Sequence, residues 1–132
     1  MTDPIADLLI RIKNAYQVSK QTVSLPFSNL KWNILKILEQ EGSILGVKED
    51  GQDKKKILIT LNYSKEGEPA LVDVKRVSRP RCRVYVDKNH LPRMKKTFGY
   101  SIISTPAGIM TGFEARKKGL GGEVICNIFT AG

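Results

Sequence analysis

Apolar side chains near the amino terminus recur every three or four residues, which is the spacing of one face of an α-helix. Asp3 is a suitable N-cap residue, and Pro4 suits the first helical position because no N–H is needed there. The pattern predicts an amphipathic helix from Pro4 onward, whose apolar face consists of Ile5, Leu8, Leu9, Ile12 and Tyr16.

The rest of the first half combines strand and helix patterns. A short strand is predicted at 22–25, followed by a helix that Ser28 can cap and Gly42 can end. Two further strands are predicted at 44–47 and 57–63, on either side of a turn. The first half is therefore expected to have the element order α, β, α, β, β.

The segment SKEGEP combines glycine, proline and charge without any periodicity, so we expect a boundary there between subdomains at 1–66 and 67–132. In the second half, Thr111 and Glu114 have the spacing of a capping box, which predicts a short helix ending at Gly119. The strands of this half are expected at 70–77, 83–86, 101–104 and 123–129, with a helical turn at 91–97.

These elements predict an α+β fold made of two small α+β subdomains packed side by side. The first has the order α-β-α-β-β, and the second is a mostly antiparallel sheet with a short helix.

The charge of the chain indicates a polyanionic partner. Lys and Arg number 22 against 13 Asp and Glu, and the formal net charge is +9. Residues 1–66 hold ten basic and eight acidic residues, whereas 67–132 hold twelve and five, and nine of those twelve lie in a block at 75–96. Nucleic acid is the first expectation and an anionic membrane the second. The basic block looks strand-like and is interrupted by prolines, which disfavours a membrane-surface helix, and no apolar run is long enough to span a bilayer.

Catalysis and metal binding lack the necessary residues. His90 is the only histidine, and Cys82 and Cys126 are the only cysteines, so neither a nucleophilic triad nor a four-ligand zinc site is supported. The glycines at 119–122 follow a predicted helix and enter a strand, which is the reverse of a phosphate-binding loop. We expect no enzyme activity, no cofactor and no metal, and two reduced cysteines in a cytoplasmic protein.

One part of the basic block has the pattern expected of an RNA-binding strand. Alternation along the strand would place Arg81, Arg83 and Tyr85 on one face, with Arg79 nearby. It would place Cys82, Val84 and Val86 on the other, apolar face, toward the core. Arginine can bind phosphates, and tyrosine can stack on a splayed base or pack against arginine stems.

The stretch from residue 101 to residue 126 resembles the carboxyl-terminal signature of the bacterial-type small-subunit ribosomal protein eight family. That signature runs Ser-Thr-Ser-x-Gly-Val-Met-Thr, then Glu-Ala-Arg, then Gly-Gly-Glu, and here it reads STPAGIMT, EAR and GGE. The opening DPIADLLIRIKNA, the EQEG at 39–42 and the RVSRP at 76–80 are similar to further motifs of this family in the same order. The resemblance thus covers essentially the whole chain.

The resemblance implies binding to an irregular stem in the central domain of small-subunit ribosomal RNA, in support of subunit assembly. It implies that the protein sits in the ribosome, cytoplasmic or organellar, beside neighbouring small-subunit proteins such as protein five. It also leaves open repression of the chain's own messenger RNA. The main contact is expected at Ser104, Thr105, Tyr85, Gly122 and Glu123, and a secondary contact at Asp3, Pro4 and the run Lys54 to Lys56, which includes Lys55.

Three departures from the family pattern affect this expectation. Pro106 replaces the second serine of the Ser-Thr-Ser loop and removes both an N–H and a hydroxyl from the presumed RNA surface. Gly112 and Phe113 replace a more polar pair, and the ending NIFTAG replaces an aromatic-rich one. An alternative role for Ser104 and Thr105 is simply to close a turn.

Overall fold

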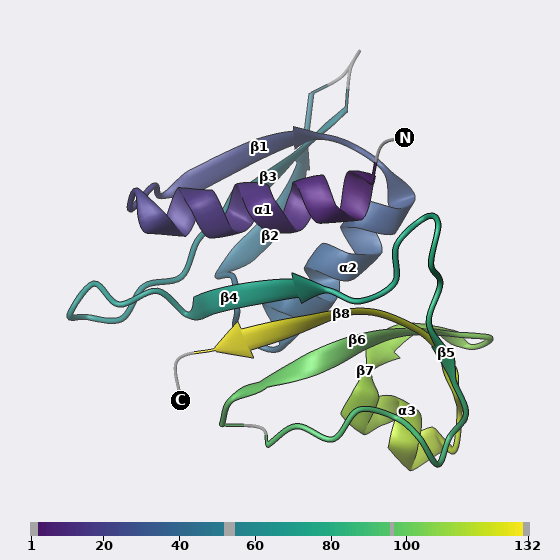
Figure 1. Ribbon diagram of the computed structural model, residues 1–132. Helices are drawn as coiled ribbons and strands as arrows, with labels where there is room; N and C mark the ends of the chain where they lie inside the picture. The colour runs from purple at the N-terminus through teal and green to yellow at the C-terminus, as the bar shows by residue number, and fades with distance from the viewer. Residues whose placement is uncertain (1–2, 52–54, 96, 131–132) are drawn as a thin grey trace. The chain divides into compact units, whose positions relative to one another are not determined.

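The computed structural model describes residues 3–51, 55–95 and 97–130 (Figure 1). They form two compact units: an amino-terminal unit, Pro4–Val72, and a carboxy-terminal unit, Asp73–Thr130 together with Asp3. The division lies six residues beyond the boundary expected from the SKEGEP segment.

The amino-terminal unit has the predicted order α, β, α, β, β, which confirms this part of the α+β prediction. Its three strands form an antiparallel sheet in the order β1-β3-β2. The elements are α1 (Pro4–Gln17), β1 (Thr22–Pro26), α2 (Asn29–Gln40), β2 (Gly46–Asp50) and β3 (Lys56–Thr60).

Local sequence explains where the helices of this unit begin and what they bury. Pro4 is the first residue of α1, as its spacing predicts. The Ser28 hydroxyl caps α2 by accepting from the Lys31 N–H at 3.2 Å. Strand β3 buries alternate residues, Ile57 and Ile59, completely, and each helix buries one apolar stripe.

The carboxy-terminal unit is built on a five-stranded sheet and one short helix. The sheet has the order β4-β8-β6-β7, and β5 pairs with β8 outside this path. Its elements are β4 (Leu71–Arg76), β5 (Tyr85–Val86), β6 (Gly99–Thr105), β7 (Gly108–Thr111), α3 (Gly112–Lys118) and β8 (Gly122–Thr130).

A compact apolar cluster underlies this sheet and α3. The cluster joins side chains from the loop before β6, from three strands and from the helix, so that one core positions all of them. It consists of Leu91, Ile103, Met110, Ala115 and Val124. The helix α3 begins where the capping-box pattern predicts, because Thr111 Oγ1 accepts from the Glu114 N–H at 3.2 Å, and it ends at the left-handed Gly119.

A β-bulge interrupts the pairing of β6 with β8. Ile102 pairs with Cys126 and Ile103 pairs with Val124, so Ile125 is the extra residue. Its carbonyl oxygen accepts from the Val77 N–H at 3.0 Å and from the Arg76 guanidinium at 2.6 Å. The bulge therefore connects β8 to the end of β4.

Several details differ from the sequence predictions, including the strands predicted at 44–47 and 57–63, which are observed as β2 (Gly46–Asp50) and β3 (Lys56–Thr60). The pattern did not indicate β7, which pairs with β6 as the second arm of a hairpin. The helical turn predicted at 91–97 is wrong for 91–95, which is irregular: Leu91 enters the core, and the Pro92 carbonyl accepts from Arg116 at 3.2 Å instead of closing a backbone turn. Cys82 is exposed rather than core-facing, because it closes a tight turn with Arg79.

Candidate nucleic-acid interface

Three of the predicted RNA-contact residues form one row across the carboxy-terminal sheet. Tyr85 on β5 pairs with Glu123 on β8, and Glu123 pairs with Ser104 on β6. Residues directly opposite each other in an antiparallel sheet present their side chains on the same face. The sheet register thus brings these three side chains, far apart in sequence, onto one face, which we call the cross-strand row.

The members of the cross-strand row differ in what they offer a ligand. The Tyr85 side chain is 69% exposed, which is unusual for a large ring and leaves it open to stacking. Ser104 is half-buried, and among the described residues its hydroxyl has no hydrogen-bond partner. The row therefore offers an aromatic ring and a free hydroxyl.

The carboxylate of Glu123 positions an arginine beside the row. Arg83 Nη1 lies 3.1 Å from Glu123 Oε2 and 3.4 Å from Oε1, while the Arg83 side chain remains 52% exposed. Because the Arg83 end of this pair is exposed to solvent, the pair contributes at most about 1 kcal/mol to stability. Its main consequence is orientation, because the Glu123 carboxylate fixes the position of the Arg83 guanidinium.

The two glycines before Glu123 allow the strands to approach closely. A Cβ at Gly122 would lie 2.1 Å from the Ser104 carbonyl oxygen, and one at Gly121 would lie 2.4 Å from the Val86 carbonyl oxygen. A side chain at either position would therefore force the backbone apart. Gly122, predicted as a contact residue, is also required for the geometry of the row.

Thr105 uses its hydroxyl inside the turn between β6 and β7. The hydroxyl donates to the Gly108 carbonyl oxygen at 2.7 Å and accepts from the Ala107 N–H at 3.2 Å, and the residue is 8% exposed. This is the turn-closing role considered as the alternative in the sequence analysis. Pro106 and Ala107 form the exposed tip, while Gly108 has a φ of 120°, which favours glycine.

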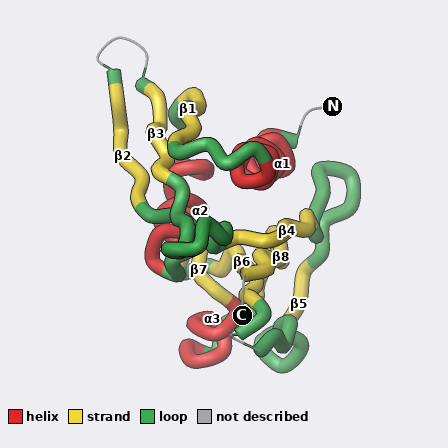
Figure 2. The backbone as a smooth tube through the Cα atoms, turned by 90° about the vertical axis from the view of Figure 1, so that its left-hand side faces the viewer, coloured by secondary structure: helices red, strands yellow, loops and turns green. Residues whose placement is uncertain are grey.

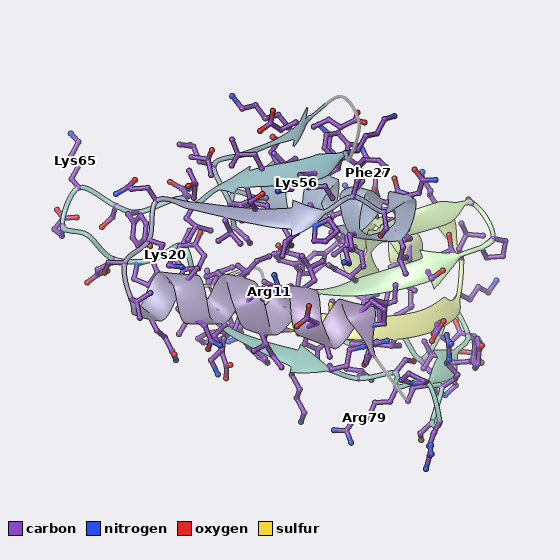
Figure 3. The ribbon with its side chains drawn as sticks, turned by 90° about the horizontal axis from the view of Figure 1, so that it is seen from above. Arg11, Lys20, Phe27, Lys56, Lys65 and Arg79 are labelled. Atoms are coloured by element: carbon purple, nitrogen blue, oxygen red, sulfur yellow. The ribbon has the colours of Figure 1, made fainter. Side chains whose placement is uncertain are left out.

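A second tight turn carries two of the predicted arginines. Arg79 and Cys82 exchange two backbone hydrogen bonds of 3.0 Å, which places Arg81 at the exposed tip. The connection between β4 and β5 that includes this turn stands away from the strands in Figures 1 and 2, and the Arg79 side chain extends from it in Figure 3. Asp3 and residues 79–82 line a cavity of about 460 Å³.

Ser78 holds this turn in place, and sequence reasoning missed it. Its hydroxyl accepts from the Val84 N–H at 2.8 Å, and the residue is completely buried. This bond satisfies the Val84 N–H with a side chain. Of the strand predicted at 83–86, only Tyr85 and Val86 form β5. The serine within the RVSRP motif was the available signal.

The residues predicted for the secondary contact do not belong to the cross-strand row, and they are divided between the two units. Asp3 belongs to the carboxy-terminal unit, where its Oδ2 lies 3.0 Å from Arg76 Nε, so both side chains are largely buried by their pairing. Pro4 and Lys55 belong to the amino-terminal unit, and Lys55 pairs with Glu49 at 3.2 Å. Lys54 lies outside the described residues.

Metal-ligating side chains do not gather in the described part of the chain. That part contains no group of three or more potential metal ligands. Burial raises the pKa of the Cys126 thiol to about 12, so the thiol is protonated at neutral pH. Among the described helices, none is long and apolar enough to cross a membrane.

An exposed ring beside positioned and neighbouring arginines is typical of RNA-binding proteins. Residues 3–129 match the family model described as Ribosomal protein S8. The chain is 47% identical over 130 residues to the small ribosomal subunit protein uS8 of Halorhodospira halophila, covering 98% of each chain. It is 42% identical over 130 residues to that of Acidobacterium capsulatum and 48% over 130 residues to that of Mycoplasmopsis pulmonis, each time covering 98% of both chains.

The chain therefore belongs to the ribosomal protein S8 (uS8) family of the small ribosomal subunit, a family of structural, non-enzymatic proteins. This confirms the family predicted from the sequence motifs.

Proposed function

We propose that the chain binds an irregular stem in the central domain of small-subunit ribosomal RNA through its carboxy-terminal unit, and that this binding supports assembly of the small subunit. Membership of the uS8 family supports the ribosomal part of the proposal. The cross-strand row, with Arg83 fixed beside it, is the observation that supports the RNA-contact part.

The row suits an irregular stem better than a regular duplex. An A-form helix offers side chains mainly phosphates and ribose hydroxyls, whereas irregular positions expose base faces and edges. Tyr85 can stack on such a base, the Ser104 hydroxyl can bond a base edge or ribose, and Arg83 can bind the adjoining phosphate. The turns at 79–82 and 105–108 border this face and supply further basic and backbone groups. A similar stem in the chain's own messenger RNA would compete for the same face.

Two arginines of similar exposure, each paired with an acid, test this proposal. The Arg83 side chain is 52% exposed and paired with Glu123, while the Arg11 side chain is 51% exposed and paired with Asp7. We expect Arg83→Ala to weaken binding to a ribosomal RNA fragment containing the stem by about tenfold and Arg11→Ala to change it less than about twofold. Equal losses for both variants would contradict the proposed interface.

A serine substitution separates recognition of the stem from general RNA affinity. Ser104→Ala removes the free hydroxyl, and we expect a loss of about 1 kcal/mol with the stem and almost none with a random duplex of equal length. Ser24→Ala, on an exposed strand position of the amino-terminal unit, is the control. The measurement is filter binding at fixed ionic strength. A loss of the same size on both RNAs would show that Ser104 contributes no specificity.

A further inference from the structure

The carboxy-terminal unit exposes two large apolar side chains among its described residues, and both are aromatic. One is Tyr85 of the cross-strand row, and the other is Phe98, whose side chain is 61% exposed. Phe98 directly precedes β6, whereas Ser104 lies near the end of the same strand. Five strand residues lie between them, and six steps of an extended strand span about 20 Å, so Phe98 lies outside the proposed stem-binding face.

Phe98, like Tyr85, has basic residues near it. The Phe98 N–H donates to the Lys95 carbonyl oxygen at 2.9 Å, which places the ring in a turn with an exposed lysine. In Figure 1 the loop that leads to this turn runs alongside α3. The Arg116 guanidinium on α3 donates a hydrogen bond to the Pro92 carbonyl oxygen of this loop at 3.2 Å. Arg93 therefore lies next to the helix that carries Lys117 and Lys118.

The other end of the loop also meets α3. A Cβ at Gly121, two residues after the helix cap, would lie 2.7 Å from the Asp87 Cα, so Lys88 lies close to the end of the helix. We define the loop–helix surface by six exposed residues: Lys88, Arg93, Lys95, Phe98, Lys117 and Lys118.

Acids of the described chain leave the basic side chains of the loop–helix surface without ion pairs. None of its five basic side chains forms an ion pair with a described residue. The nearest acid along the loop, Asp87, is held by His90, whose Nδ1 lies 2.5 Å from Asp87 Oδ1. Lys117 and Lys118 also favourably interact with the carboxyl end of the helix, but this accounts for only two of the five charges.

We propose that the loop–helix surface is a second RNA-binding surface, which takes a single-stranded segment separate from the stem. An exposed ring beside several lysines and arginines is the combination that binds single strands, since every base offers a face for stacking. A lipid bilayer fits less well, because α3 has seven residues and its buried positions, Gly112 and Ala115, give no apolar face to insert. This inference rests on the proposed function only where it calls the single-stranded segment separate from the stem. Binding of a single strand to the loop–helix surface does not depend on that function.

The test uses fluorescence anisotropy with a labelled oligouridylate of about ten nucleotides, which has no stem. We expect the free protein and the protein saturated with the ribosomal stem fragment to bind it with affinities within about threefold of each other. Displacement of the oligouridylate by the stem would show one shared surface and would overturn the inference. If the stem fragment fails to bind but the oligouridylate binds, the proposed function fails and the second surface stands.

Matched triple variants locate the binding. Changing Arg93, Lys117 and Lys118 to Ala is expected to reduce oligouridylate affinity by about tenfold while the stem affinity changes less than about threefold. The control changes three exposed lysines of the amino-terminal unit, Lys20, Lys48 and Lys65, to Ala, with the same loss of charge; Figure 3 shows two of them. Equal losses for the two triples would mean that only net charge matters and would overturn the proposal.

The ring is tested by Phe98→Leu and Phe98→Tyr. Both substitutions preserve an apolar body at an exposed site, so the fold is expected to tolerate them. We expect the leucine variant to lose about fivefold in oligouridylate affinity and the tyrosine variant to retain it, because only tyrosine keeps a face for stacking. Equal binding by all three proteins would overturn the role of Phe98. A glutamate peptide of equal length that binds as tightly as the oligouridylate would overturn the choice of RNA.

Discussion

The two halves of the chain use their charges differently. Before residue 67, ten basic residues meet eight acids, and the described ion pairs there join exposed neighbours, such as Arg11 with Asp7 and Lys36 with Glu39. After residue 66, twelve basic residues meet five acids, and Asp87 pairs with its neighbour His90. Two arginines of this half instead pair with acids distant in sequence: Arg83 with Glu123, 40 residues away, and Arg76 with Asp3, 73 residues away in the first half.

This difference shows that an ion pair can serve two purposes. Pairs between neighbours on a helix neutralise charge and add a few tenths of a kcal/mol. The long-range pairs instead fix two arginines, one at the β-bulge and one beside the cross-strand row, while most other basic side chains of this half stay exposed. The second half thus keeps a positive surface and also a defined position for Arg76 and Arg83.

The largest expected effect concerns the salt dependence of RNA binding, which tests whether the positive second half dominates. If about six of its basic side chains meet phosphates, affinity for the stem fragment should fall about a thousandfold between 50 and 200 mM salt. The slope should be unchanged in the Lys20, Lys48 and Lys65 triple variant. A flat titration of the unmodified protein would contradict an electrostatic interface.

Two glycines, one in β8 and one in β2, compare how closely the strands of the two units pack. Gly122→Ala would place a Cβ 2.1 Å from the Ser104 carbonyl oxygen, and we expect a loss of about 3 kcal/mol or more in the free energy of unfolding. Gly46→Ala would meet only the end of the Glu39 side chain at 3.8 Å, so its loss should stay below about 1 kcal/mol. Urea unfolding measures both, and similar losses would show that the strands around the row are not tightly packed.

The two cysteines allow a comparison within the second half. The pKa of the buried Cys126 thiol is raised from 9.0 to about 12 by desolvation, so the unfolded chain releases this proton first as pH rises. The contribution of the neutral thiol is complete below pH 9.0 and is lost toward pH 12, a loss of about 2 kcal/mol at pH 10.5.

Cys126→Ala should remove this part of the alkaline destabilisation, whereas Cys82→Ala, at an exposed position, should leave it unchanged. The measurement is urea unfolding at several values of pH between neutral and 10.5. Identical pH profiles for the unmodified protein and Cys126→Ala would contradict the raised pKa.

The smallest effect compares two serines that close turns. Ser78→Ala leaves the Val84 N–H without its partner in a buried site, and we expect a loss of about 1–2 kcal/mol in the free energy of unfolding. Ser64 accepts from the N–H groups of Glu66 and Glu68 in an exposed turn, where water can replace it, so Ser64→Ala should lose less than about 0.5 kcal/mol. Thermal unfolding distinguishes these outcomes, and a larger loss for Ser64→Ala would reverse the comparison.

Most of the fold could be predicted because local signals agree with the tertiary structure. Pro4, Ser28 and Thr111 each mark the start of a helix through backbone chemistry that operates within one turn. The strand β7 has no such signal: it contains four residues, and its pairing with β6 depends on the turn that the Thr105 hydroxyl closes. Residues 91–95 have the local pattern of a helical turn but are irregular in the structure. The packing of Leu91 in the core depends on residues distant in sequence, which a local pattern does not include.

The candidate site was less predictable than the fold. Strand alternation placed Arg83 and Tyr85 on one exposed face correctly but failed at Cys82, where a tight turn replaces the strand. The family motif named Ser104 and Thr105 together, yet only the structure distinguishes the free hydroxyl of Ser104 from the turn-closing hydroxyl of Thr105. Such distinctions depend on sheet register, which is set by contacts distant in sequence.

The extra residue in β8, Ile125, attaches the end of β4 and is not needed for the pairing of β8 with β6. Without Ile125 the ladder between β6 and β8 would run regularly, and Glu123 and Cys126 would still oppose Ser104 and Ile102. What would disappear is the carbonyl oxygen that receives both Val77 and Arg76. The bulge is therefore an attachment point for an outer strand: a chain with β8 shortened by one residue would keep the cross-strand row but would need a new attachment for the end of β4.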